Sequence, residues 1–146
     1  MKELPFTPPG GPPRVAPPDP RIYPAMGQDN IFRMLEDFYT ELSGSPISGM
    51  FATDPAVLQE QAHKSARFFT GLLGGPPLYH EKHGNPALRF RHLPFPIDSK
   101  ARLIWLGCFK KVLVNAELEY NFPAEYLPGF LAFIEGFSTW MVNKSS

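Results

Sequence analysis

Apolar residues recur at helical spacing in the first half of the chain. Over residues 29–42 the positions three and four residues apart are Ile31, Met34, Leu35, Phe38 and Leu42. This spacing places them on one face and predicts an amphipathic helix, with Tyr39 at the edge of that face. The stretch 43–48 predicts a loop with a short turn, and Phe51 follows it.

A second helix has clear start and stop signals. Asp54 is suited to the N-cap, Pro55 fits the first turn, and the Gly-Gly-Pro-Pro run at 74–77 ends the helix after about Leu73. Its expected inner face consists of Leu58, Ala62, Ser65, Phe68, Phe69 and Leu72. Ser65 is a hydroxyl within this apolar face, so it either bonds to a carbonyl one turn back or faces a cavity.

The second half of the chain predicts two more long helices after a long loop. Residues 78–97 are expected to be mostly loop, with one short helix at 87–92 before Pro94 and Pro96. Asp98 and Ser99 begin a third long helix that is expected to reach about residue 118, and a fourth covers about 128–142. Because strand-like alternation does not compete with these patterns, the predicted fold class is all-α.

The N-terminal stretch has a different composition. Residues 1–24 contain nine of the 18 prolines, which disfavour a helix. We expect an extended or disordered arm over residues 1–22 and a single globular domain over 23–146. A proline-rich motif that binds a partner is the alternative interpretation of the arm.

Charge and composition exclude several classes. The formal net charge is zero and no basic stripe is present, which argues against nucleic-acid binding. No run of about 18 apolar residues predicts a membrane span, and no secretory signal is recognisable. A single cysteine, Cys108, fits a reducing compartment, so we expect a cytoplasmic protein. The 13 Phe, five Tyr and two Trp fit either a packed core or a pocket for a large flat ligand.

His92 is the histidine best placed for chemistry. It ends the short predicted helix, apolar residues flank it, and Pro94 and Pro96 constrain the backbone that follows. Such an imidazole suits a single axial ligand to an iron macrocycle. From the spacing alone, an ordinary half-buried histidine that is hydrogen-bonded to a carbonyl is the favoured interpretation. His80 and His83 lack the further ligands that a metal site needs.

Other chemistries find little support in the sequence. A phosphate-binding G-x-x-x-x-G-K-[ST] element and a G-x-S-x-G nucleophile motif are both absent. Cys108 lies on a helix face beside Phe109 with no adjacent base, which argues against a nucleophile.

The chain from about Tyr23 to Val142 resembles the truncated haemoglobins. The residues that carry the resemblance are Gly74-Gly75-Pro76-Pro77-Leu78-Tyr79, His83-Gly84-Asn85-Pro86-Ala87-Leu88-Arg89, Arg91-His92, Pro94-Phe95 and Ile97. Trp105-Leu106 and Cys108, together with Phe38-Tyr39, are similar to the second group of that family. The resemblance favours the ligand interpretation of His92.

The resemblance implies a truncated globin fold, a two-on-two helical sandwich around haem b. His92 would be the proximal ligand to the iron. The distal pocket would contain Tyr39, Phe51, Gln61, Ser65 and Trp105. Phe68 would press on the haem, and Lys64, Tyr79 and Arg91 would lie near its propionates.

Residue types in that pocket predict slow ligand release. Bound dioxygen carries partial negative charge, so the Tyr39 hydroxyl and the Trp105 indole N–H would hold it. A hydrogen bond to a charged group contributes roughly 1.5–3 kcal/mol, which corresponds to ten- to hundredfold slower escape. Dioxygen transport requires rapid release of the ligand, so a role as a bulk dioxygen carrier is disfavoured.

Three pocket positions depart from the family's usual pattern. Phe51 replaces a frequent Tyr and removes one donor. Gln61 is polar where small residues are common, and it either donates to the ligand or swings out as a gate. Ser65 is smaller than the usual Leu or Gln, which enlarges the pocket or admits a water.

Two functional classes therefore stay open. One is a binder of dioxygen and other diatomic ligands, at a pentacoordinate or weakly hexacoordinate iron. The other is a haem enzyme for nitric oxide dioxygenation or peroxide reduction, which needs an external reductase. A haem sensor is the least favoured interpretation. We expect a monomer or homodimer, and no membrane or nucleic-acid partner.

Overall fold

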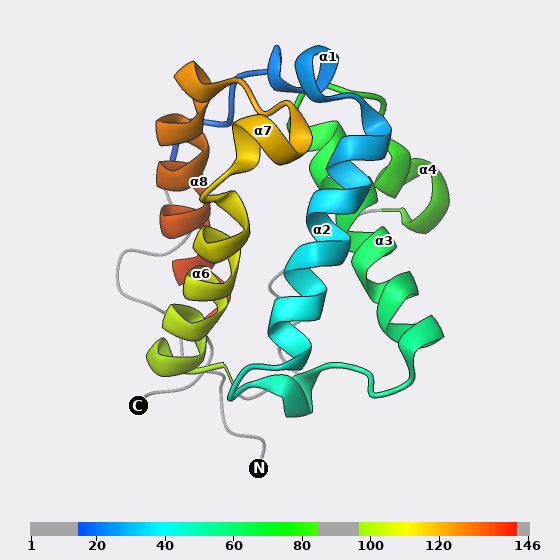
Figure 1. The fold of residues 1–146 in the computed structure, drawn as a ribbon, viewed down its shortest axis with the longest axis vertical. Coiled ribbons are helices and arrows are strands. Elements are labelled where there is room, and N and C mark those ends of the chain that lie inside the picture. The colour runs from blue at the N-terminus through cyan, green and yellow to red at the C-terminus, as the bar shows by residue number, and fades with distance from the viewer. Residues whose placement is uncertain (1–14, 85–96, 143–146) are drawn as a thin grey trace.

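A computed structural model describes residues 15–84 and 97–142, and within these ranges the regular secondary structure is helical. The elements are α1 (Ile22–Met26), α2 (Gln28–Ser43), the 3₁₀ turn η1 (Ser48–Met50), α3 (Pro55–Leu72), α4 (Leu78–His83), α6 (Ser99–Leu113), α7 (Ala116–Tyr120), the 3₁₀ turn η2 (Ala124–Tyr126) and α8 (Leu127–Thr139). Figure 1 shows α2 and α3 side by side, with α6 and α8 forming a second pair next to them. The predicted all-α fold is confirmed.

Helix α2 forms where the apolar periodicity predicts it. Its buried residues are the predicted set, Ile31, Met34, Leu35, Phe38 and Leu42. The helix begins directly after Gly27, whose φ of 80° separates it from α1, and ends at Gly44. Since both ends coincide with glycines and the inward face is continuous, local sequence signals account for this element.

Helix α3 has the predicted N-terminus but a differently placed buried face. The Asp54 carboxylate accepts hydrogen bonds from the Ala56 and Val57 N–H groups at 2.8 and 3.2 Å. The buried residues are Ala62, Ala66, Phe69 and Thr70, whereas Leu58, Ser65, Phe68 and Leu72 are only half-buried. The predicted inner face was therefore partly wrong. Ala62, Ala66 and Thr70 are small and lie at a spacing of four, which fits the close packing of α3 on α2.

Two short helices form where the sequence predicted a loop or the continuation of a longer helix. Residues 78–83, expected as loop, form α4, because Tyr79 is buried there and Gly84, with φ of 76°, ends the helix. The long helix expected to reach residue 118 ends at Leu113 and is followed by α7. Helix α7 turns back so that Ala116 and Tyr120 are buried.

Three further predictions concern the end of α8, the short helix at 87–92 and the proline-rich arm. Helix α8 ends at Thr139, a little before the predicted end at 142. The short helix predicted at 87–92 lies outside the described residues, as do residues 1–14 of the proline-rich arm. The arm boundary after residue 22 stays a prediction.

Aromatic rings join the two helix pairs at the centre of the core. Phe38 of α2 stacks on Phe109 of α6, with ring centroids 4.2 Å apart. Phe109 also meets Phe69 of α3 and Phe130 of α8 at 5.7 Å each. These four rings are almost fully buried. They fix how the pairs cross, because one large side chain from each long helix fills the same interior volume.

None of the described helices combines the length and the apolar character that crossing a membrane requires.

A hydrogen bond between α7 and α2 gives a test of this packing. The buried Tyr120 hydroxyl donates to the Asp37 carboxylate, so Tyr120→Phe should lower the free energy of unfolding by about 1–2 kcal/mol. Urea unfolding of Tyr120→Phe, Asp37→Ala and the double variant measures the coupling between the two side chains. Strictly additive losses would show that the two groups do not interact.

Candidate functional site

A hydroxyl pair joins α2 to α3 in the half-buried part of the interior. The Tyr39 Oη and Ser65 Oγ atoms lie 2.6 Å apart, and either hydroxyl can be the donor. Burial raises the pKa of Tyr39, with the Ser65 contact acting in the opposite direction. The phenol therefore stays protonated at neutral pH and is available as a neutral hydrogen-bond donor.

Phe51 and Gln61 lie beside this pair. The Phe51 ring meets the edge of Tyr39 at 5.6 Å. The Gln61 Oε1 atom accepts a hydrogen bond from the Ala52 backbone N–H at 3.1 Å. Gln61 thus ties α3 to the loop that carries Phe51. Because the Gln61 Oε1 atom accepts this bond, the Nε2 donor of the same amide group faces away from the Ala52 N–H.

Trp105 enters the same region from α6. Its ring meets Phe38 at 5.3 Å and Phe109 at 5.6 Å, both edge-on. Trp105 is half-buried and packs against the core. The structure therefore brings the indole next to the residue that precedes Tyr39. An indole N–H can only donate a hydrogen bond.

Phe68, Tyr79 and Phe137 form an aromatic group further along α3. Phe68 lies one turn beyond Ser65 and contacts Tyr79 edge-on at 6.2 Å. It also stacks on Phe137 of α8, with centroids 6.3 Å apart and planes 28° apart. We did not single out Phe137 from the sequence. The spacing of four that it shares with Phe133, whose ring it stacks on, was the available signal.

Positive charge gathers where α3 meets α4. Lys64 is half-buried on α3, and the Arg67 Nη1 atom lies 3.0 Å from Glu60 Oε1 and 3.2 Å from His83 Nε2. Burial, followed by the nearby cations Lys64, Arg67 and Lys82, lowers the pKa of His83. Sequence reasoning named Lys64, missed Arg67, and considered His83 only as a weak metal ligand. Their role depends on α4, which we had not predicted.

Two predicted site residues cannot be placed. His92 and Arg91 lie outside the described residues, so the axial ligand and one proposed propionate contact stay predictions. Within the described ranges, the histidine, cysteine and carboxylate side chains form no group of three that could hold a metal ion.

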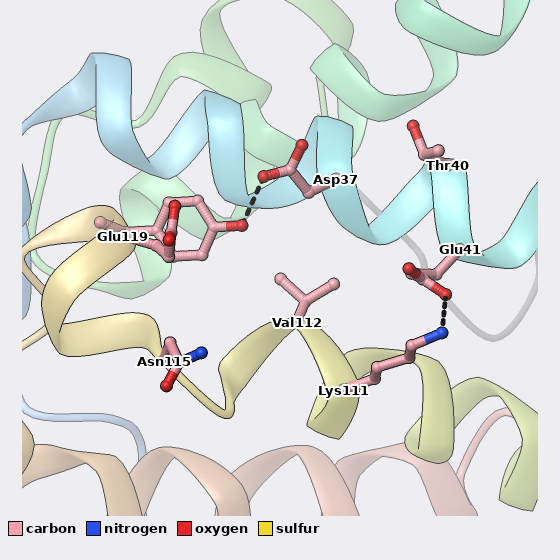
Figure 2. A pocket seen from close by; sticks show the side chains of 8 residues that line it. Asp37, Thr40, Glu41, Lys111, Val112, Asn115 and Glu119 are labelled. Carbon is pink, nitrogen blue, oxygen red and sulfur yellow. Dashed lines mark hydrogen bonds and ion pairs between the residues drawn. The ribbon is translucent and has the colours of Figure 1, made fainter.

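A surface depression between α2 and the α6–α7 region is a poor candidate (Figure 2). Its lining residues are Asp37, Thr40, Glu41, Lys111, Val112, Asn115, Glu119 and Tyr120. The Lys111 Nζ atom lies 3.0 Å from Glu41 Oε2, and Tyr120 donates to Asp37, as the dashed lines show. Because these groups satisfy one another, we place the site at Tyr39 and Ser65 instead.

Comparison with known proteins gives a family and a fold. The model of the bacterial-like globin family matches residues 21–133. The group 2 truncated hemoglobin YjbI of Bacillus subtilis (strain 168) is 40% identical over 97 residues, which cover 66% of this chain and 72% of that protein. The chain therefore belongs to the bacterial-like globin family and, within it, to the truncated haemoglobins of the second group.

Solved structures agree with this assignment. Phosphate-bound Hell's gate globin IV superposes with a TM-score of 0.85 at 35% identity, covering 92% of this chain and 81% of that one. The truncated oxygen-avid haemoglobin from Bacillus subtilis gives 0.74 at 36% identity, covering 86% and 99%. The predicted truncated globin fold is confirmed. Membership of the family implies a haem that binds small diatomic ligands such as dioxygen.

The bond between Gln61 and the loop can be tested directly. Gln61→Leu removes the acceptor for the Ala52 N–H, so the Ala52 amide should exchange with solvent about two- to tenfold faster. Hydrogen exchange measured by NMR gives the rate. Gln59→Leu is the matched control, since Gln59 lies on the same helix but contacts Glu36. Equal exchange in both variants would mean that Gln61 does not hold the loop.

Proposed function

We propose that this chain is a haem-b protein that binds dioxygen and other diatomic ligands and releases them slowly. The observation that carries the proposal is the neutral phenol of Tyr39, held 2.6 Å from Ser65. When bound, the haem supplies an iron that takes one protein ligand and one diatomic ligand. His92 is the protein ligand in this proposal.

The described residues fit such a group chemically. A large flat cofactor needs apolar walls with few polar groups. Half-buried aromatic rings from Phe51, Phe68 and Trp105 supply the walls, and the Tyr39–Ser65 pair supplies the polar groups. For the acidic edge of the cofactor, Lys64, Tyr79 and Arg91 are the proposed contacts. Arg67 adds a further cation at the α3–α4 junction.

The single phenol proton of Tyr39 can be donated either to Ser65 or to a ligand. A phenol has a single O–H, so Tyr39 cannot donate both to Ser65 and to a ligand. For Tyr39 to hold a ligand, Ser65 must donate to the Tyr39 oxygen. Ser65 then orients the phenol, and the phenol proton points away from α3. In this proposal Ser65 is a positioning residue for Tyr39.

Trp105 and Gln61 complete the proposed distal side. The Trp105 indole adds a donor that cannot act as an acceptor. Gln61 has its carbonyl end bound to the Ala52 N–H, which leaves the Nε2 end as the possible donor to a ligand. This bond favours a Gln61 that stays in place over one that swings out as a gate.

Catalysis on the same ligand is the alternative function. Oxidation of nitric oxide to nitrate would use the retained dioxygen, and reduction of peroxide to water would also take up protons, which could pass through the Tyr39–Ser65 hydroxyl pair. An external reductase would be needed for either reaction. Multiple-turnover consumption of nitric oxide with a reductant supports the enzyme. A single stoichiometric burst supports the binder.

Removal of the proposed iron ligand is the first test. His92→Ala should abolish the histidine-ligated Soret spectrum of the haem-loaded protein, because no other imidazole is proposed to reach the iron. His80→Ala is the matched control, since His80 is exposed on α4, and its spectrum should be unchanged. A normal histidine-ligated spectrum in His92→Ala would transfer the role to another residue. Absence of any Soret band in the wild type would refute haem binding.

Dioxygen release tests the distal donors. Tyr39→Phe and Trp105→Phe should each speed release about tenfold or more, because each loses a hydrogen bond to a partly charged ligand. Ser65→Ala should speed release severalfold by freeing the phenol to rotate. Flash photolysis and stopped-flow mixing measure these rates. Slower release in Ser65→Ala would reverse the proposed direction of the Ser65–Tyr39 hydrogen bond.

A further inference from the structure

The segment that leads into α1, together with the first two residues of α1, is packed against two helices that lie far apart in the sequence. Residues 15–23, which we name the clasp, run past α8 toward α1 in the blue part of the chain (Figure 1). Val15 packs against the core at one end, and Ile22 is fully buried at the other. Pro18, between them, is buried as well. This part of the proline-rich stretch therefore has specific contacts.

At its N-terminal end the clasp packs against Gly136 of α8, where the missing side chain leaves a notch. Gly136 lies in the last turn of that helix, and a Cβ atom placed there would be 2.1 Å from the Val15 Cγ1 atom. Glycine normally destabilises a helix relative to alanine by roughly 0.5–1 kcal/mol. Its presence at this point is explained by the approach of Val15.

At its second end the clasp is joined to the C-terminus of α3. The Tyr23 N–H donates to the Leu73 carbonyl at 2.9 Å. A Cβ atom at Gly74 would be 2.0 Å from the Pro20 carbonyl oxygen, and one at Gly75 would be 2.5 Å from the Tyr23 ring. Two neighbouring glycines thus give the clasp room, in addition to ending the helix.

The two helices held in this way carry the Phe68–Phe137 stack. Helix α3 packs mainly on α2 and α4, and α8 packs mainly on α6. They meet through long aromatic side chains, Phe68 with Phe137 and Phe69 with Phe130. Phe68 and Phe137 are both only half-buried, whereas Phe69 and Phe130 are buried. Gly136, the notch residue, directly precedes Phe137.

We propose that the clasp holds α3 and α8 at a fixed separation and thereby slows the loss of bound haem. Proline restricts the backbone, so a segment containing Pro17, Pro18 and Pro20 is stiff and links α3 to α8 with little change in length. Release of the clasp lets the Phe68–Phe137 contact open. The effect on haem rests on the proposed function, in which Phe68 lines the cofactor, whereas the docking of the clasp does not.

Paired variants of the haem-loaded full chain test the clasp. Val15→Asp should speed haem transfer to excess apomyoglobin at least about fivefold, because a charge cannot remain in the Gly136 notch. Ala16→Asp is the matched control, since Ala16 is the exposed neighbour, and its transfer rate should stay within about twofold of the wild type.

A second pair tests the notch from the α8 side. Gly136→Ala should also speed haem transfer, and Val15→Ala should restore the wild-type rate in the double variant by removing the clashing Cγ1 atom. Gly129→Ala on the same helix is the control, because a Cβ atom there meets nothing within 4 Å. Transfer rates in Val15→Asp and Gly136→Ala that match their controls would overturn the proposal.

Hydrogen exchange separates the clasp from the cofactor. The Tyr23 amide, bonded to Leu73, should exchange faster in Val15→Asp and Gly136→Ala than in their controls. Faster exchange with unchanged haem transfer would overturn the link to haem retention. If the wild type binds no haem, the proposed function fails, and the exchange rates alone decide whether the clasp docks as described.

Discussion

The stacking of Phe38 on Phe109 is the contact on which the site depends. These two fully buried rings lie 4.2 Å apart and fix the rotation of α2 against α6. Successive residues of a helix point about 100° apart, so a Phe38 that faces α6 leaves Tyr39 facing α3. There the Tyr39 hydroxyl meets Ser65 at 2.6 Å. Any rotation of α2 that broke the ring stack would also break this hydroxyl pair.

The close packing of α3 on α2 creates both the core and the site. Ala62, Ala66 and Thr70 are buried at a spacing of four, and the Thr70 hydroxyl is satisfied by the Ala66 carbonyl at 2.7 Å. With small residues at the contact, Ser65 and Phe68 are turned to the edge of the interface, where they stay half-buried. The polar pair and the aromatic walls are thus consequences of helix packing. Substitutions in the core would therefore alter the geometry of the ligand site.

Local signals predicted the long helices and much of the site, but they missed the short elements. The ends of α2 and α3 follow from glycines, from Asp54 and from Pro55, all within one turn of the helix that they define. Helices α4 and α7 are held by the burial of Tyr79 and Tyr120, whose partners lie elsewhere in the chain. The structure joins Tyr39 to Ser65 and packs Trp105 against Phe38, whereas the roles of these residues at a haem, like that of His92, stay predictions.

The sequence by itself determined where α2 and α3 begin, which face of α2 is buried, and the family to which the chain is similar. Only the tertiary structure decided that Gln61 is bound to Ala52 and that Phe137 joins Phe68. The same is true of the clasp on Gly136. Periodicity and capping act within a few residues, so they can be recognised in the chain itself. Contacts such as these depend on how the helices cross, which is set by the packing of the whole core.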